Sequence, residues 1–343
     1  MFQTNKSQRS DLNSLWLGIA FSTLFTGLIW LIGQRLMAIP HLPDTGPSWY
    51  YWMLPQQTLA GQLSAWGFYL AHQFSIWGLI YYAQRQRALQ KVQYTTNLHS
   101  FNYAALGLNA FFIVLHLIQT HVWYDGLAQD VSIWSSQASV VLMLVLILLM
   151  ENPRRGLFFG KKVPFSKRVI GFVRKYHGYI FSWGIIYTFW YHPMEITTGH
   201  LIGFFYTFLL LLQGSLFFTR IHRNRWWTFT QEALVLVHGA LVAVMQANNM
   251  WPMFGFGFAG LIVITQLHGL GLSRWVRAMV IGFYTVSALW VYNGRGWDKL
   301  EEVIRIPIIE YLIVFILALL IWLGIWITQK VGNLFRHEPI ESV

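Results

Sequence analysis

The sequence contains no cysteine among its 343 residues. This absence excludes disulfides, thiolate metal ligands, iron–sulfur clusters and cysteine nucleophiles. Any bound metal ion must therefore be held by histidine, carboxylate, methionine or backbone oxygen. The HExxH, nucleophile-elbow and phosphate-loop patterns are also missing. The GFGFAG stretch at 255–260 fits a dinucleotide motif only formally, because it follows no strand, and its small residues favour close helix packing instead.

Charge is scarce as well. Only 11% of the residues are charged and 55% are hydrophobic, whereas soluble domains carry about 25% charged residues. No stretch is polar enough to form a separate soluble domain, so we expect one membrane domain over residues 1–343. The net charge of +11 comes from short basic clusters between apolar runs. That arrangement is typical of cytoplasmic loops next to anionic lipid, and we predict no nucleic-acid partner.

Long apolar runs recur along the whole chain. A bilayer core requires about 20 residues of apolar helix. Short polar breaks at 192–199 and 246–252 contain Pro193 and Pro252, which suit a turn and the first turn of a helix. The resulting prediction is an all-α, polytopic bundle of about ten transmembrane helices, at 14–38, 62–83, 101–123, 131–150, 175–192, 199–220, 229–246, 252–270, 275–293 and 306–328.

The charges give a sidedness for these helices. Helices one to four (14–150) and five to ten (175–328) are separated by a basic loop at 151–175. With ten helices, the basic clusters fall on one side of the membrane, which predicts cytoplasmic N and C termini. We expect a multi-pass protein of the plasma (inner) membrane of a prokaryote or of an equivalent organelle membrane. The basic set includes Lys6, Arg9, Lys330 and Arg336, and the opposite side receives Asp44, Asp125, Asp130, Glu195 and Asn248.

Histidine is the residue type that points to chemistry. Most of the twelve histidines lie within or at the ends of predicted helices. A polar group at membrane depth is costly unless it is partnered, so each is a functional candidate. A short turn places His192, Glu195 and His200 at one depth, which His121 and Asp125 reach from helix three. Imidazoles with carboxylates suit Zn, Fe, Mn or Cu. The alternative is that these histidines cap helix ends and the acids are solvated.

A second hypothesis is a pair of haem b groups bound by histidines near the two membrane surfaces. His99 and His116 are separated by about 25 Å along helix three, and His177 and His192 by about 22 Å along helix five, at about 1.5 Å per residue. Histidines near arginines at helix ends are, alternatively, interfacial residues. The candidate cofactor ligands are His99, His116, His177, His192 and His222.

Acid–base chemistry would use a third group of residues. His238 and His72 are expected near the middle of helices seven and two, and Glu232 begins helix seven. A buried carboxylate near an imidazole suits an acid–base pair or a proton relay. His72 is the expected hydrogen-bond partner of His238. Glu232 is alternatively a helix N-terminal charge that the helix dipole stabilises.

Three functions remain open on the sequence. The first is a membrane enzyme or electron carrier, an oxidoreductase or metal-dependent enzyme, that binds metal or haem. Its substrate would be lipid-soluble, and the 18 Trp, 16 Tyr and 26 Phe suit a quinone, a tetrapyrrole or a lipid. The second is a proton-coupled transporter that uses His and Glu. The third is a metal-free acyl- or glycosyl-group transferase. The bilayer is the predicted partner in each case, and the sequence predicts no oligomeric state.

Overall fold

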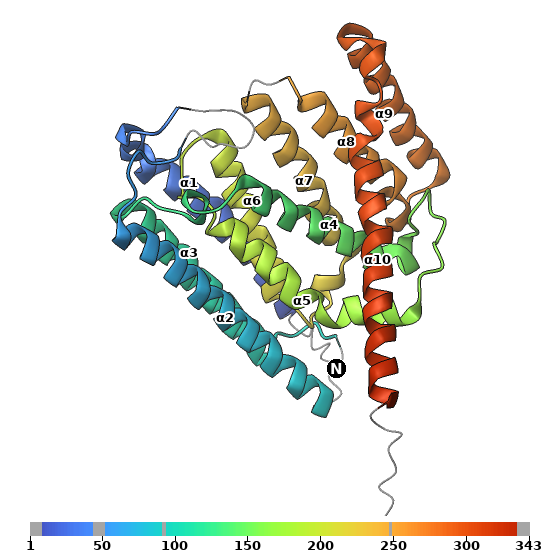
Figure 1. Ribbon diagram of the computed structural model, residues 1–343, viewed down its shortest axis with the longest axis horizontal. Coiled ribbons are helices and arrows are strands. Elements are labelled where there is room, and N and C mark those ends of the chain that lie inside the picture. Colours follow the sequence, from blue (N-terminus) through green and yellow to red (C-terminus); the bar gives the residue numbers. More distant parts are fainter. Residues whose placement is uncertain (1–8, 44–51, 91–93, 247–248, 335–343) are drawn as a thin grey trace, which may run out of the picture. The chain divides into compact units, whose positions relative to one another are not determined.

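The computed structural model describes residues 9–43, 52–90, 94–246 and 249–334. Within these residues every regular element is helical, and there are ten α-helices (Figure 1). Lys6, Asp44, Asn248 and Arg336, which contribute to the predicted sidedness, lie outside the described residues. The helices are α1 (Ser10–Ile32), α2 (Leu59–Gln90), α3 (Ser100–Val122), α4 (Ile133–Arg155), α5 (Lys167–Phe189), α6 (Thr198–Ser215), α7 (Arg225–Met245), α8 (Trp251–Ile264), α9 (Arg274–Arg295) and α10 (Glu302–Leu334).

These ten helices correspond one to one with the ten predicted apolar segments. Seven stretches of the described residues are long and apolar enough to cross a membrane, which is the pattern of a multi-pass membrane protein with apolar surfaces for lipid. The two predicted breaks are also helix boundaries, because α5 ends at Phe189, and α8 has Pro252 in its first turn. The seven stretches are 10–38, 100–122, 133–155, 225–245, 251–269, 274–295 and 297–331.

The basic connection between α4 and α5 is shorter than the predicted loop 151–175. Helix α4 continues through Pro153 to Arg155, and α5 already begins at Lys167. Charge indicates where a helix leaves the apolar layer, but lysine and arginine are good helix formers, so the helix itself continues. The Asn152 amide holds the connection by donating to the Val163 carbonyl (2.8 Å) and accepting from its N–H (2.9 Å).

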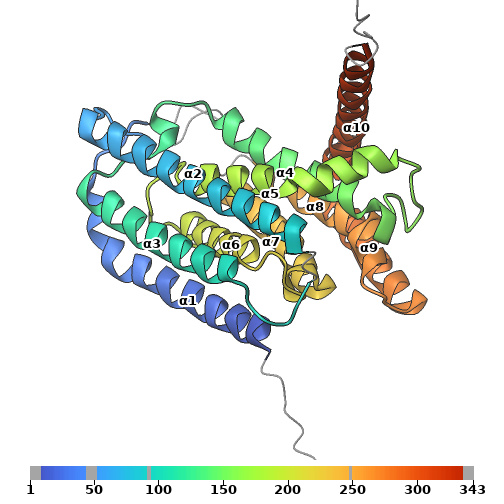
Figure 2. The same cartoon turned by 90° about the horizontal axis from the view of Figure 1, so that it is seen from below.

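The chain divides into two compact units. Unit 1 comprises residues 1–140 and 178–246. In unit 1, α6 packs against α1, α3 and α7, and α2 packs against α3 (Figures 1 and 2). One apolar cluster joins the start of α1 to the end of α6 and the start of α7 through Leu15, Leu209, Leu212, Leu216, Ile221 and Trp227.

Unit 2 comprises residues 141–177 and 247–343. Here α8 packs against α9 and α10, and two glycines set the separation. A Cβ at Gly257 would lie 2.8 Å from Cβ of Ile306, and one at Gly260 would lie 3.0 Å from the Tyr284 hydroxyl. Small residues thus let the helix backbones approach closely, as the sequence interpretation of 255–260 predicts.

Candidate functional site

The turn between α5 and α6 is held in place from two directions. Leu127 and Ala128 donate backbone hydrogen bonds to the carbonyls of Trp190 (3.0 Å) and Tyr191 (2.8 Å). A Cβ at Gly126 would lie 2.7 Å from the Tyr191 carbonyl oxygen, so the two segments touch through their backbones. The Met194 N–H donates to the Thr120 hydroxyl (3.0 Å), which ties the turn to the end of α3.

His192 and His200 lie against one another at this turn. Their ring centroids are 4.5 Å apart and the rings are nearly perpendicular, at 89°. Thr197 caps α6, and its hydroxyl lies 2.7 Å from Nδ1 of His200. The rings of Trp52 and Phe204 pack on His192, with centroids 5.6 and 5.3 Å away. The short turn therefore brings together the two histidines that the sequence placed at one depth.

Glu195, the acid of the same turn, joins a different group. The Tyr124 hydroxyl donates to Glu195 Oε1 in a very short hydrogen bond, and Nε2 of His41 lies 2.6 Å from the same hydroxyl. Since Tyr124 has one proton to give, His41 is the donor to its oxygen. Burial lowers the pKa of His41, and the Glu195 carboxylate opposes that shift. His41 and His200 are within electrostatic reach of one another.

The sequence interpretation did not include His41 or Tyr124. Tyr124 follows α3 directly, between the candidates His121 and Asp125, and has a left-handed backbone with φ of +45°. His41 lies in the Trp- and Pro-rich segment after α1, far away in sequence. The only available signal was the high density of polar aromatic residues in these two connections.

His121 is turned away from the histidine pair. Its Nδ1 lies 2.8 Å from the Leu117 carbonyl, and its Nε2 lies 3.4 Å from the Ile32 carbonyl at the end of α1. Both ring nitrogens thus face backbone acceptors. The prediction that His121 shares a site with His192 is wrong, because the phase of α3 directs its side chain toward α1.

Asp125 also lies apart, at the start of α2. Its Oδ1 accepts from the Gly126 N–H (2.7 Å) and from the Gln57 amide (3.2 Å). Its Oδ2 is buried without a hydrogen-bond partner and would lie 2.5 Å from a Cβ at Gly61. Burial raises the pKa of Asp125 to about 6. Among the described residues, no three His, Asp or Glu side chains are grouped so that they could hold a metal ion.

Deeper in unit 1, His116 is enclosed by aromatic rings. It stacks on Trp190 at 4.3 Å between centroids, and the edges of Phe189 and Phe204 contact it. Neither of its ring nitrogens has a hydrogen-bond partner, although the residue is fully buried. His116 is within electrostatic reach of both His192 and His72.

His72 has a complete set of partners instead. The Trp190 indole donates to its Nδ1 (3.2 Å), so the proton of the neutral ring lies on Nε2, which faces the Asn109 carbonyl oxygen at 2.8 Å. The ring stacks on Phe112 at 4.2 Å. Because both nitrogens are engaged, the predicted hydrogen bond between His72 and His238 does not form.

His238 packs instead against α6. A Cβ at Gly203 would lie 2.9 Å from Cε1 of His238, and Nδ1 of His238 is buried without a partner. His238 is within electrostatic reach of both members of the pair, His192 and His200. Glu232, two turns earlier on α7, is buried and lies near Tyr206. Nδ1 of His192 has no hydrogen bond of normal geometry among the described residues, although the backbone at His192 and Pro193 interacts with the ring.

The remaining cofactor candidates have structural partners. His99 caps α3 in a reciprocal arrangement with Asn102, and its Nε2 lies 3.0 Å from the Thr95 hydroxyl. Nδ1 of His222 donates to the Gln213 carbonyl (2.9 Å). In unit 2, Nδ1 of His177 donates to the Arg174 carbonyl (2.7 Å). His99 thus lies at a helix end and His222 in the short helix Ile221–Arg223, whereas His177 lies within α5.

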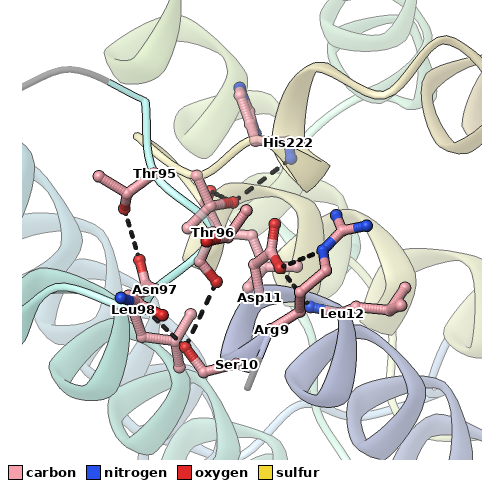
Figure 3. Close-up of polar contacts among 11 residues, drawn as sticks. Arg9, Ser10, Asp11, Leu12, Thr95, Thr96, Asn97, Leu98 and His222 are labelled. Carbon is pink, nitrogen blue, oxygen red and sulfur yellow. Dashed lines mark hydrogen bonds and ion pairs between the residues drawn. The ribbon is translucent and has the colours of Figure 1, made fainter. Parts of the chain in front are cut away.

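Figure 3 shows the polar network beside His222, at the start of α1. Asp11 is fully buried there; its N–H donates to the Thr96 carbonyl (3.0 Å) and its carboxylate lies 3.6 Å from Arg9. Ser10 accepts from the Leu98 N–H (2.9 Å). Sequence reasoning began helix one at residue 14 and missed this network, which anchors α1 to the segment before α3.

A haem between His192 and His200 would need a wider gap. Iron between two imidazoles requires ligand nitrogens about 4 Å apart, with the rings beyond them, since each Fe–N bond is about 2 Å. A 4.5 Å separation of the ring centroids leaves no room for that arrangement. His116 is likewise covered by Trp190 and Phe189.

The fold and these contacts define a class: an all-helical membrane protein with a cluster of buried and half-buried imidazoles in unit 1. No protein-family model, no curated protein and no solved structure matches the chain. Function must therefore be argued from the cluster itself, which we define as His41, His116, His192, His200 and His238 with Tyr124 and Glu195.

Proposed function

We propose that all ten helices span the membrane, with both termini cytoplasmic. The helices α2, α5 and α6 are the three outside the strongly apolar set, and they carry His72, His177 and His200. Helices that bury polar side chains inside a bundle are less apolar than those facing lipid. Their 32, 23 and 18 residues give about 27–48 Å of helix, and about 30 Å spans a bilayer core. In this topology the cluster lies in the outer half of the membrane.

We propose further that the cluster transfers protons, and that the protein is a proton-coupled transporter of a plasma (inner) or equivalent organelle membrane. The observation that carries this proposal is a set of three histidines with buried ring nitrogens that have no hydrogen-bond partner among the described residues: both nitrogens of His116, which is fully buried, and Nδ1 of His192 and His238, which are half-buried. They come from three different segments of the chain. His192 is within electrostatic reach of both His116 and His238, so it lies between them in a relay. Buried polar atoms normally have partners, so these nitrogens are available to water, a substrate or a proton.

The chemistry requires no cofactor. Neutral imidazole accepts a proton on one nitrogen and releases the other proton from the opposite nitrogen, so adjacent rings pass a proton without redox change. His200 is within electrostatic reach of His41. His41 is hydrogen-bonded to the Tyr124 hydroxyl, and that hydroxyl donates to the Glu195 carboxylate. That carboxylate is the proton acceptor or donor at the outer rim. His72, with both nitrogens engaged, is a positioning residue and not part of the relay.

The test is proton uptake by proteoliposomes that hold a pH-sensitive dye, driven by a potassium diffusion potential. We expect the full chain to acidify the lumen faster than protein-free vesicles do. His192→Gln should remove most of this flux, since an amide cannot pass a proton on. The matched control is His121→Gln, on a histidine whose nitrogens face backbone carbonyls away from the pair. Equal fluxes for both variants, or no flux above that of empty vesicles, would refute the proposal.

A second pair of variants tests position instead of chemistry. Gly203→Ala places a methyl 2.9 Å from Cε1 of His238 and must displace that ring, whereas a Cβ at Gly214 on the same helix meets nothing within 4 Å. We expect the first variant to slow proton uptake and the second to leave it unchanged. If both behave like the native chain, His238 does not belong to the relay.

A metal- or haem-dependent membrane oxidoreductase is the second candidate function. Its support is the same unpartnered nitrogens, which would bind an ion only after His116, His192 and His238 turned toward one another, since no three such side chains are grouped for a metal among the described residues. Metal analysis and an absorption spectrum of the purified chain separate the two proposals. Stoichiometric Fe, Zn, Mn or Cu that His192→Gln removes, or a Soret band, supports the oxidoreductase. Proton flux from metal-free protein supports the relay. For the oxidoreductase, the membrane-delivered substrate would be a quinone, a tetrapyrrole or a lipid.

A further inference from the structure

A tight basic turn lies against the end of α8 in unit 2. The turn at 156–161 is closed by the Leu157 N–H and the Lys161 carbonyl (2.9 Å), with φ of +83° at Gly160. Phe159 donates from its N–H to the Ile264 carbonyl (2.8 Å), and the Thr265 hydroxyl donates to the Leu157 carbonyl (3.1 Å). These bonds hold the turn beside His268.

His268 and Arg277 form a polar pair at this place. Nη1 of Arg277 lies 3.3 Å from Nδ1 of His268. A guanidinium can only donate, so Nδ1 accepts and the neutral ring carries its proton on Nε2. That Nε2 is buried and has no hydrogen bond of normal geometry, although the Val263 carbonyl interacts with the ring. Nε of Arg277 is also buried without a partner. Nε of Arg277 therefore lacks an acceptor among the described residues, and Nε2 of His268 has no acceptor in normal geometry beside it.

The surrounding charge is positive. Arg155 is buried. Its Cβ lies where a Cβ added at Gly269, the residue after His268, would be only 2.9 Å away. Arg154 donates to the Gly269 carbonyl (3.1 Å) and is ion-paired with Glu151, so this carboxylate is already neutralised. Lys161 and Lys162 are exposed on the turn itself. An anion would thus meet unpartnered donors in a positive field.

We propose that this cluster binds the phosphate of an anionic phospholipid. With Nη1 directed at His268, the Nε edge of Arg277 is the edge that binds phosphate through two parallel hydrogen bonds. An exposed apolar side chain lies beside the cluster: Phe159 is 56% exposed, and its ring centroid is 6.0 Å from that of His268. Apolar contact does not stabilise a free phosphate, whereas the acyl chains of a phospholipid pack against apolar side chains. Basic pockets at the cytoplasmic ends of membrane helices suit anionic headgroups.

The test is lipid binding by the purified full chain, measured by native mass spectrometry with phosphatidylglycerol and phosphatidylcholine of identical acyl chains. We expect the first phosphatidylglycerol to bind at least about tenfold more tightly, equivalent to about 1.4 kcal/mol. Arg277→Gln should remove most of this preference. Arg277→Lys should restore only part of it, because lysine keeps the charge and loses the two-pronged edge.

The matched control is Arg274→Gln, which removes the same charge from the same helix. Arg274 lies over the Trp275 ring (5.3 Å) and contributes no contact to the His268 pair; we expect a change below about twofold. Three results would overturn the proposal: equal losses in the two Gln variants, which would indicate diffuse charge; no preference for phosphatidylglycerol; or full competition by inorganic phosphate at equal affinity, which would indicate a free-anion site. Circular dichroism of each variant confirms that it is folded before binding is compared.

Discussion

Unit 1 and unit 2 treat buried polar groups in different ways. In unit 1 several of them form a connected set, in which His72 bonds to Asn109, and Asn109 in turn to Ser215 (2.8 Å). In unit 2 the contact between α8 and α10 relies on glycines, Glu302 accepts from Arg295 (2.8 Å) and Tyr292 (3.1 Å), and Glu310 on α10 is buried with an Oε2 that has no hydrogen bond among the described residues. Polar networks are demanding to build and costly when incomplete, which makes their location informative. The difference lies in the histidines: the cluster of five imidazoles belongs to unit 1, whereas the polar contacts of unit 2 include an ion pair, Glu302 with Arg295.

The largest effect is expected at His72. His72→Ala leaves a cavity. It also removes the hydrogen-bond partner of two buried groups, the Trp190 indole N–H and the Asn109 side-chain carbonyl. Truncating a large buried side chain costs about 2–5 kcal/mol, and an unsatisfied polar group adds about 1–3. Thermal denaturation in detergent should show a loss of several degrees or a failure to fold. A neutral substitution would show that unit 1 does not depend on its polar network.

The next effect concerns the glycine packing of unit 2. Gly257→Ala places a methyl 2.8 Å from Ile306, and overpacking of this kind costs about 1–3 kcal/mol. Gly282→Ala on α9 meets nothing within 4 Å and should be neutral or slightly stabilising, since alanine is the better helix former. Melting temperatures of the two variants, measured side by side, give the comparison. Equal stability would mean that the α8–α10 contact is looser than the glycines indicate.

Asp125 gives unit 1 a pH dependence. Its folded pKa of about 6 lies above the ordinary value of 3.8 because burial disfavours the carboxylate. The folded state therefore binds more protons between these values, and stability falls as pH rises from about 4 to about 6. Each pKa unit corresponds to about 1.4 kcal/mol. Asp125→Asn should flatten the melting temperature across this window. A native chain that becomes more stable across it would contradict the assignment.

The smallest effect is expected at Glu310. Its Oε2 makes no hydrogen bond among the described residues, so Glu310→Gln removes a buried ionisable group without breaking a contact to that atom. The change should alter stability by less than about 0.5 kcal/mol or raise it slightly. Chemical denaturation of the two proteins is the appropriate measurement. A loss comparable to that of His72→Ala would show that Glu310 itself belongs to a polar network in unit 2.

The helices were predictable because hydropathy is a local property. The ten apolar segments and the turn that joins His192 to His200 follow from runs of neighbouring residues. The extra turns of α5, from Lys167, were missed because charge marks the membrane boundary and not the end of the helix. Within the helices, rotational phase decided the outcome: His121 faces α1, although its depth suited the pair.

The partners of the candidates were not predictable from the sequence. The contact between His41 and Tyr124 joins residues on either side of α2 and α3, and the one between His72 and Trp190 joins α2 to the turn after α5. Nothing local specifies such pairings, because they depend on how whole helices pack. The sequence could therefore give a set of candidate histidines but not the subset with free nitrogens.

The backbone bonds that hold the α5–α6 turn have a consequence for local opening. Leu127 and Ala128 donate across to Trp190 and Tyr191, while Gly126 fits against Tyr191 with no space for a side chain. The segment after α3 and the segment that carries His192 should then separate together or not at all, as one cooperative unit. Their amide hydrogens would exchange with deuterium at a common slow rate, and Gly126→Ala should release that whole group at once.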